Sequence, residues 1–251
     1  IAGALLLSLT FCALTAPQWF YWMPGSCAAE MEVLVLFLLV FVVCVRQFPQ
    51  KHNSQPLDTI ACTIFGVLYV PFMMAYFAKL LFTSDWSHSG MMQRFDVRAS
   101  VLFFYFVFVV KCCDSGALFI GKRWGRHKMI PRISPGKTWE GLAGGFLGGI
   151  LASVVSYYVF RSHAPDGAWL LGRVPFGLWD ALVLGVLLSG MGVLGDLVES
   201  LLKRAANTKD SGGLIPGLGG LLDVLDSLLL AAPVAYYYVR IFLATAGRGV
   251  T

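Results

Sequence analysis

The stretch GLWDALVLGVLLSGMGVLGDL (residues 177–197) decides the fold, because it is mostly apolar over about the 20 residues that a helix needs to cross a bilayer. Similar apolar runs, each bounded by polar residues or by Gly and Pro, lie at residues 2–22, 31–48, 57–82, 99–113, 141–160 and 219–243. This pattern predicts an all-α fold, a polytopic transmembrane helical bundle with about seven spans.

The composition agrees with a membrane protein. Of the 251 residues, 57% are hydrophobic and only 13% are charged, whereas a soluble globular protein has about 25% charged residues. The apolar runs leave no room for a separate soluble domain. Because the chain begins at Ile1 with an apolar run, we expect it to be trimmed, with further spans preceding it in the intact protein.

The net charge of +5 is concentrated in particular loops. With alternating spans, the loops near residues 46–56, 111–140 and 198–218 share one side of the membrane, and they hold most of the Lys and Arg residues. The positive-inside rule places that side in the cytoplasm. The charge therefore indicates topology and not a nucleic-acid partner.

We divide the chain into N-terminal transmembrane helices (1–110) and a catalytic transmembrane region (111–251) with polar cytoplasmic loops at 111–140 and 198–218.

Three smaller patterns carry structural expectations. Glycines recur at helical spacing, which predicts close helix packing; they are Gly141, Gly144, Gly145, Gly148 and Gly149. The six cysteines lack the spacing of a zinc site, and we expect neither zinc nor a structural disulfide. His127 and His163 have no evident partner and are expected to be loop histidines.

Acidic residues within apolar runs are the first sign of a site. Asp196 ends one run, and Asp223 and Asp226 lie inside the last one. An ionised carboxylate near the bilayer centre costs about 2.5–3.5 kcal/mol, so such residues face a cavity or a cation. The i, i+3 spacing puts Asp223 and Asp226 on one helical face. Oxygen ligands suit Mg²⁺, and we predict a magnesium site formed by Asp196, Asp223 and Asp226.

Basic residues near these acids point to phosphate. Lys203, Arg204 and Lys209 precede a glycine-rich turn at residues 215–220, and such a combination neutralises and cradles phosphate groups. Lys137 and Thr138 are also predicted to contact phosphate, although the segment from Ser134 to Glu140 resembles the N-terminal cap of a helix as well. The segment around them is not a nucleotide P-loop, because Pro131 occupies a position where that motif requires Gly.

Two blocks of sequence closely resemble the signature of phosphatidate cytidylyltransferases, also called CDP-diacylglycerol synthases. The first block contains DSGA (114–117), GK (121–122) and ISPGKTWEG (133–141). The second contains GDL (195–197), SLLKR (200–204), KDSG (209–212) and LIPG (214–217), followed by Gly219, Gly220, Asp223 and Asp226. Together they cover most of residues 110–230.

The resemblance implies a multi-pass enzyme of the bacterial inner (cytoplasmic) membrane, with its active site on the cytoplasmic side. Such an enzyme joins CTP to phosphatidic acid, giving CDP-diacylglycerol and diphosphate in phospholipid biosynthesis. It also implies Mg²⁺, a second, monovalent cation such as K⁺, and a homodimer. Carried over by position, Asp196 and Asp223 are metal ligands, and Asp226 is a ligand or orients one.

Roles for the remaining motif residues follow from the same resemblance. The catalytic group is expected to comprise Lys203, Arg204, Lys209 and Asp210. The substrate-binding group is expected to comprise Asp114, Ser134, Lys137, Thr138, Gly219 and Gly220. Two positions depart from the family pattern, which has His at the position of Leu218 and Arg at the position of Val224. We expect a divergent but working enzyme, since the acids and lysines suited to phosphoryl transfer are kept.

Two other functions fit the same residues. A CTP-dependent kinase for dolichol or another polyprenol also needs acids, lysines and magnesium, but it releases CDP. A transporter could use the membrane acids as an ion or proton relay. The dense polar loops weigh against transport, which has no use for a phosphate cradle on one face.

Overall fold

The computed structural model describes residues 26–48, 55–81, 99–162, 177–206, 208 and 221–243, and these residues are mostly helical. The predicted all-α transmembrane class is confirmed. Five helical segments in the described part are long and apolar enough to cross a membrane: Pro56–Phe77, Val101–Trp124, Trp139–Phe160, Leu178–Ala205 and Leu222–Phe242. A sixth segment, Leu36–Gln47, is apolar but shorter. The predicted run at 2–22 lies outside the described residues.

Packing divides the chain into one unit of residues 1–82 and another of residues 83–251. The first unit contains α2 (Ser26–Gln47), α3 (Pro56–Val67), the π-helical turn η1 (Leu68–Phe72) and α4 (Met73–Leu81). Pro56 stands in the first turn of α3, where its missing N–H costs nothing. Pro71 lies inside η1, because a proline interrupts regular α-helical hydrogen bonding and the helix widens there.

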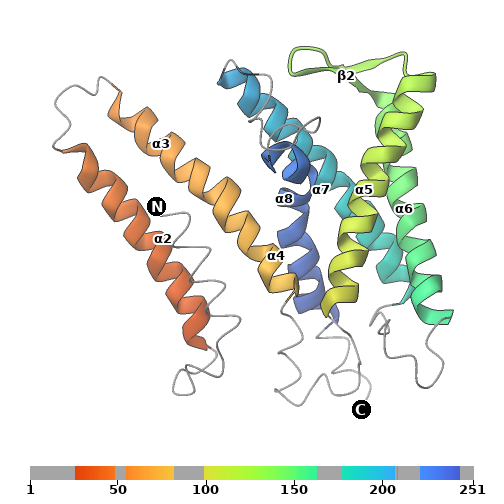
Figure 1. The fold of residues 1–251 in the computed structure, drawn as a ribbon, viewed down its shortest axis with the longest axis horizontal. Coiled ribbons are helices and arrows are strands. Elements are labelled where there is room, and N and C mark those ends of the chain that lie inside the picture. Colours follow the sequence, from red (N-terminus) through yellow and green to blue (C-terminus); the bar gives the residue numbers. More distant parts are fainter. Residues whose placement is uncertain are drawn as a thin grey trace. The chain divides into compact units, whose positions relative to one another are not determined.

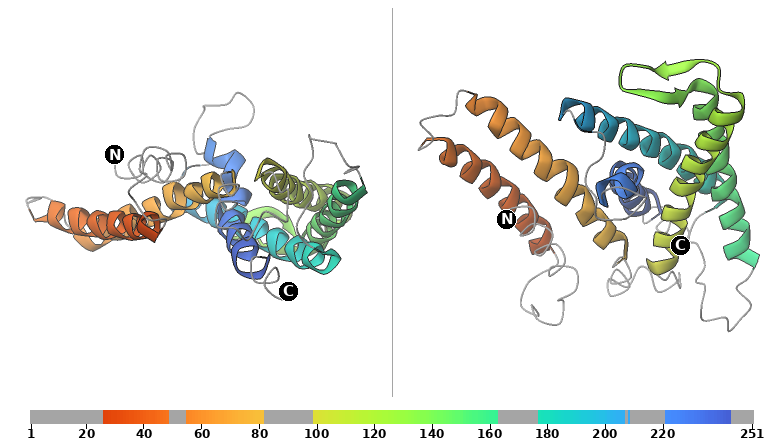
Figure 2. Two further views of the ribbon diagram at one scale, coloured as in Figure 1. Left: turned by 90° about the horizontal axis from the view of Figure 1, so that it is seen from below. Right: turned by 45° about the horizontal axis from the view of Figure 1, so that its top comes forward.

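The second unit contains the polar segments of both sequence blocks. Its elements are α5 (Ala99–Trp124), β1 (Lys128–Ile130), β2 (Ser134–Thr138), α6 (Trp139–Ser162), α7 (Leu178–Ala205), α8 (Leu221–Tyr238) and the π-helical turn η3 (Val239–Leu243). An antiparallel β1–β2 hairpin joins α5 to α6 at one end of the unit (Figure 1), with Lys128 opposite Thr138 and Ile130 opposite Ser134. In the right-hand view of Figure 2, α8 is seen nearly end-on between α5 and α7.

Two helices extend further than the hydropathy pattern predicts. The run at 99–113 continues as α5 to Trp124, and the run at 177–197 continues as α7 to Ala205. Residues 111–124 and 198–205 are therefore helical, so the prediction of polar loops at 111–140 and 198–218 is wrong for these residues. Lys111 and Lys203 on these extensions contact α8, and Arg204 contacts the hairpin, so the helices do not need to end where the apolar run ends.

The predicted role of the glycine ladder is confirmed. A Cβ atom at Gly116 on α5 would lie 2.6 Å from the carbonyl oxygen of Gly144, and one at Gly148 on α6 would lie 2.8 Å from that of Cys112. Distances under about 3 Å cannot be accommodated by a real Cβ atom. The backbones of α5 and α6 therefore meet directly, as in other membrane helix pairs with small residues at the interface.

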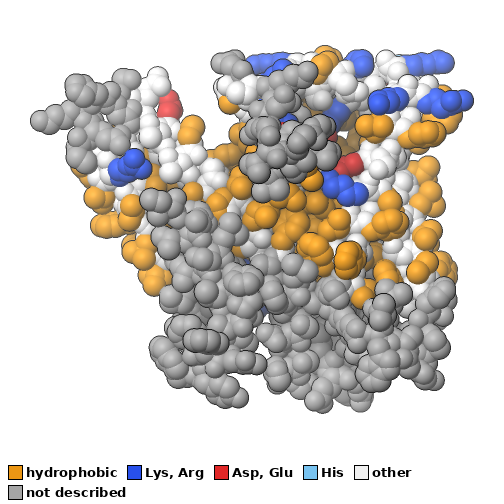
Figure 3. Space-filling view, in the orientation of Figure 1, with side chains coloured by type: hydrophobic (Ala, Val, Ile, Leu, Met, Phe, Trp, Pro, Cys, Tyr) orange, Lys and Arg blue, Asp and Glu red, His pale blue; other side chains and the backbone are white. Residues whose placement is uncertain are grey.

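Polar residues inside the second unit find partners on other helices. The Tyr105 hydroxyl of α5 is 2.6 Å from the Ser153 hydroxyl of α6, which in turn donates to the Ala181 carbonyl of α7. Apolar side chains cover the outside of the helices, and Lys and Arg gather at the hairpin end (Figure 3). The apolar helices make this a membrane protein.

Candidate active site

Three carboxylates converge where α7 meets α8. Asp196 and Glu199 lie one turn apart on α7, and Asp226 lies on α8; one oxygen from each is within 4.8 Å of the others. The two helices come this close because Gly195 packs against the backbone carbonyl of Asp226. Glu199 is only 1% exposed. We call Asp196, Glu199 and Asp226 the carboxylate cluster.

Lys203 extends this site by one turn of α7. Its ammonium group is 3.1 Å from Glu199 and forms a shorter ion pair with Asp223 on α8. Asp223 and Asp226 share a helical face, as predicted, but their partners differ: Asp223 pairs with Lys203, and Asp226 joins the carboxylate cluster. The role of Asp223 as a metal ligand stays a prediction.

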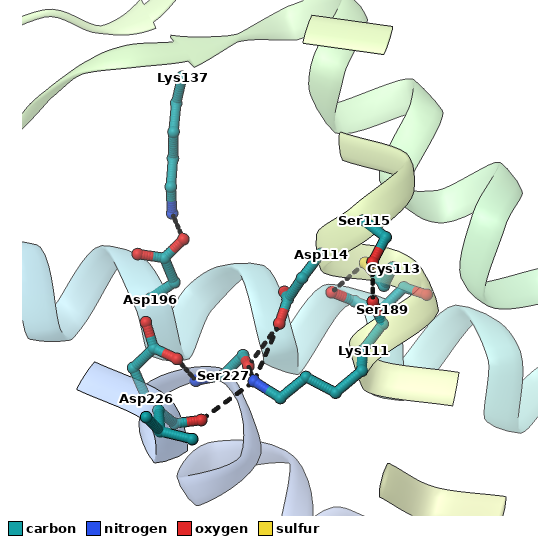
Figure 4. Close-up of polar contacts among 10 residues, drawn as sticks. Lys111, Cys113, Asp114, Ser115, Lys137, Ser189, Asp196, Asp226 and Ser227 are labelled. Atoms are coloured by element: carbon teal, nitrogen blue, oxygen red, sulfur yellow. Dashed lines mark hydrogen bonds and ion pairs between the residues drawn. The ribbon is translucent and has the colours of Figure 1, made fainter. Parts of the chain in front are cut away.

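The hairpin brings a second lysine to the cluster. The Lys137 side chain descends from β2 to α7, and its Nζ atom is 2.8 Å from an Asp196 carboxylate oxygen (Figure 4). The structure therefore brings the two sequence blocks together, because Lys137 and Asp196 are 59 residues apart in the sequence. At the end of α7, the Arg204 guanidinium donates to the Ile133 carbonyl at 3.4 Å and makes a further link to the hairpin.

Charge balance shows why a cation suits the cluster. Among the residues that the structure describes, four carboxylates meet here, from Asp196, Glu199, Asp223 and Asp226, and Lys137 and Lys203 provide ammonium groups that contact them. A divalent cation would balance the excess negative charge, and buried carboxylates are costly without such compensation. Carboxylate oxygens are also the ligands that hard divalent cations prefer. The donor set therefore fits a divalent metal.

Asp114 belongs to a neighbouring group of polar residues on α5 and α8. Its carboxylate accepts a hydrogen bond of 2.8 Å from the Ser227 hydroxyl and lies 3.3 Å from Lys111 Nζ. Figure 4 shows this group beside Asp226, whose carboxylate accepts from the Ser227 backbone N–H. A role for Asp114 in substrate binding stays a prediction.

Thr138 caps the N-terminus of α6, in agreement with the helix start that the sequence offered as an alternative. Its hydroxyl accepts a hydrogen bond of 3.1 Å from the Gly141 N–H in the first turn of α6, and the residue is only 4% exposed. Ser134 lies at the other end of β2 and is half-buried. Contacts of Ser134, Lys137 and Thr138 with a substrate stay predictions.

His127 lies in the loop between α5 and β1, as predicted, but the expectation that it lacks a partner is wrong. Its Nδ1 atom is 2.6 Å from a carboxylate oxygen of Glu140, and the same carboxylate accepts from the backbone N–H groups of Arg126 and His127. Glu140 thereby ties the start of the hairpin to the start of α6. A histidine three residues from a helix end can find a partner on the next helix, which sequence spacing alone does not reveal.

Other predicted residues fall outside the described part of the chain. These are Lys209, Asp210, Leu218, Gly219, Gly220 and His163. Val224 lies within α8. The hydropathy pattern does not single out Glu199. Its spacing of three residues from Asp196 and four from Lys203, however, places all three on one face of a helix.

Comparison with known proteins identifies relatives. Residues 1–242 match the sequence profile of the Cytidylyltransferase family. The chain is 33% identical to the phosphatidate cytidylyltransferase of Bacillus subtilis over 217 residues, which is 85% of this chain and 70% of that protein. It is 32% identical to that of Mycobacterium bovis, covering 88% of this chain and 67% of the relative. It is 39% identical to that of Haemophilus influenzae, covering 55% of this chain and 45% of the relative.

Proposed function

Since the chain belongs to the Cytidylyltransferase family, we propose that it is a phosphatidate cytidylyltransferase, which converts CTP and phosphatidic acid into CDP-diacylglycerol and diphosphate. The relatives described above support this substrate pair, because their names state that activity. The alternatives considered from sequence, a polyprenol kinase and a transporter, are not favoured by those relatives.

The observation that carries the proposal is the meeting of the carboxylate cluster with Lys137 and Lys203 at the ends of apolar helices. Nucleotidyl transfer from CTP needs groups that neutralise a triphosphate, and lysines beside a metal site provide them. A membrane helix end also suits the second substrate, because the acyl chains of phosphatidic acid stay in the lipid while its headgroup reaches the polar site.

In the proposed reaction, a phosphate oxygen of phosphatidic acid attacks the α-phosphorus of CTP. The new P–O bond forms as the bond to the β-phosphate oxygen breaks, and diphosphate leaves with that electron pair. Lys137 and Lys203 hold the phosphates in line and offset their negative charge. Mg²⁺, held by Asp196, Glu199 and Asp226, would supply further charge neutralisation at the reacting phosphates.

Lys137 and Lys203 contact carboxylates in the structure. We infer that each lysine exchanges a carboxylate partner for a phosphate oxygen when CTP binds. The bound metal would keep the carboxylates neutralised during that exchange. By family resemblance, Arg204, Lys209, Asp210, Gly219 and Gly220 complete the pocket.

The setting of the enzyme is also part of the proposal. Lys122, Arg123, Arg126, Lys128 and Arg132 surround the hairpin, and the positive-inside rule would place that end, with the active site, in the cytoplasm. The relatives are bacterial, which supports the bacterial inner membrane. A homodimer and a second, monovalent cation rest on the family resemblance alone, and light scattering of the purified protein tests the dimer.

The deciding experiment measures diphosphate release by the purified protein in detergent. CTP, Mg²⁺ and phosphatidic acid are supplied together, and each is then omitted in turn. We expect release only with all three, and CDP-diacylglycerol in equal amount. CDP as the nucleotide product would indicate a kinase. No release from folded protein would contradict the proposal.

A further inference from the structure

Lys111 is a charged residue in an unexpected place. It lies near the middle of α5, within the membrane-spanning segment Val101–Trp124. A lysine there is costly unless it faces a polar cavity and has partners, so such a residue is by default a functional candidate. The proposed reaction, as described above, does not use it.

The partners of Lys111 lie on two helices. Its Nζ atom is 3.3 Å from the Asp114 carboxylate on its own helix. It donates to the Val224 carbonyl at 3.0 Å and to the Ser227 hydroxyl at 3.1 Å, both on α8 (Figure 4). One ammonium group therefore uses its three donors to join α5 to the first turns of α8.

The α8 residues that Lys111 contacts lie on both sides of Asp226 in the sequence, and Asp226 is the α8 member of the carboxylate cluster. Val224 and Ser227 flank Asp226 along the helix, and the Ser227 N–H donates to the Asp226 carboxylate. Ser227 is fully buried, and its hydroxyl also donates to Asp114. On the opposite side, Gly195 of α7 meets the Asp226 backbone. Asp226 is thus held between α7 and the Lys111 contacts.

We propose that Lys111 is a positioning residue, which fixes α8 against α5 so that Asp226 meets Asp196 and Glu199 in a geometry able to bind a divalent cation. The inference rests on the proposed function only for the identity of that cation.

Positioning and simple electrostatics predict opposite effects of removing Lys111. Loss of a positive charge beside the carboxylates would by itself strengthen cation binding. Loss of a residue that orients a ligand typically weakens metal binding 10- to 100-fold. A purely structural role would lower the unfolding temperature and leave the cation affinity unchanged.

The test measures the unfolding temperature of the full chain in detergent as Mg²⁺ is titrated, without CTP or lipid. The variants are Lys111→Met and Lys111→Arg, with Tyr105→Phe as a control that removes a buried hydrogen bond elsewhere on α5. For Lys111→Met we expect the half-saturating Mg²⁺ concentration to rise about tenfold or more. For Lys111→Arg, the half-saturating Mg²⁺ concentration should stay within about threefold of the wild-type value. For Tyr105→Phe, this concentration should not change.

An unchanged or lower half-saturating concentration in Lys111→Met would overturn the inference. So would an equal rise in Tyr105→Phe, or a wild-type protein whose unfolding temperature does not respond to Mg²⁺. Diphosphate release by the wild type is measured separately with CTP and phosphatidic acid. A protein that binds Mg²⁺ through Lys111-dependent geometry but makes no CDP-diacylglycerol would contradict the proposed function and leave the positioning role supported.

Discussion

Gly195 on α7 packs directly against the backbone carbonyl of Asp226 on α8, and a Cβ atom at position 195 would overlap with that oxygen. Asp196, the next residue along α7, belongs to the carboxylate cluster together with Asp226. The close approach of two backbones therefore sets the distance between carboxylates on different helices.

Gly195→Ala should separate the two helices and disperse the cluster. The obstacle is backbone rather than a flexible side chain, so a helix must shift. We expect a loss of diphosphate release of about tenfold or more, and a lower unfolding temperature. Gly190→Ala is the matched control on the same helix, because a Cβ atom there meets Phe146 at an ordinary 3.6 Å. Equal activity in the two variants would contradict the proposed role of this contact.

The hydropathy pattern predicts the transmembrane class and the glycine spacing predicts close helix packing, and both predictions are confirmed. Neither pattern singles out Glu199 or Lys111, and the physical reason is the same for both. Both lie beyond or near the end of an apolar run, where hydropathy predicts a loop. In the structure the helices continue. Lys111 donates to residues of α8, and Glu199 pairs with Lys203 of its own helix, which also pairs with Asp223 of α8.

The different partners of Asp223 and Asp226 could not be predicted from their spacing. The i, i+3 pattern places both on one face of α8, but it does not say which lies nearer to Lys203 or to Asp196. That choice depends on how α7 and α8 pack, which is a property of the folded chain. The pairing of Lys137 with Asp196 is likewise set by the hairpin.

Glu199→Gln should weaken the binding of a divalent cation. The amide keeps the size of the side chain but removes one negative charge from the cluster. We expect about 10- to 100-fold higher Mg²⁺ for half-maximal activity. The measurement is diphosphate release across a Mg²⁺ series, with Asp58→Asn on α3 as a charge-matched control. An unaltered Mg²⁺ requirement in Glu199→Gln would exclude Glu199 from the metal site.

Thr138→Ala should destabilise the start of α6. The Thr138 hydroxyl caps this helix, and loss of such a cap costs about 1 kcal/mol. Thr138→Ser keeps the hydroxyl and should restore the unfolding temperature. The KM for CTP, measured on both variants, separates capping from substrate contact. A raised KM in Thr138→Ala without any change in unfolding temperature would indicate that the hydroxyl serves the substrate.

Lys203→Met should impair both stability and activity. It removes the cation between Glu199, which is buried, and Asp223, whose side chain is 12% exposed. Removing one partner of a buried ion pair costs about 3–5 kcal/mol, because the remaining charge is uncompensated. Activity should fall about 100-fold or more, since the proposed phosphate contact is lost as well.

Lys203→Arg separates these two effects. Arginine keeps the positive charge, so the unfolding temperature should stay near that of the wild type. Its planar guanidinium directs its donors differently from an ammonium group, so activity should remain reduced. Full activity in Lys203→Met would show that Lys203 contacts neither phosphate nor the reacting groups. A normal unfolding temperature of Lys203→Met would show that another group compensates the charges of the Glu199 and Asp223 carboxylates.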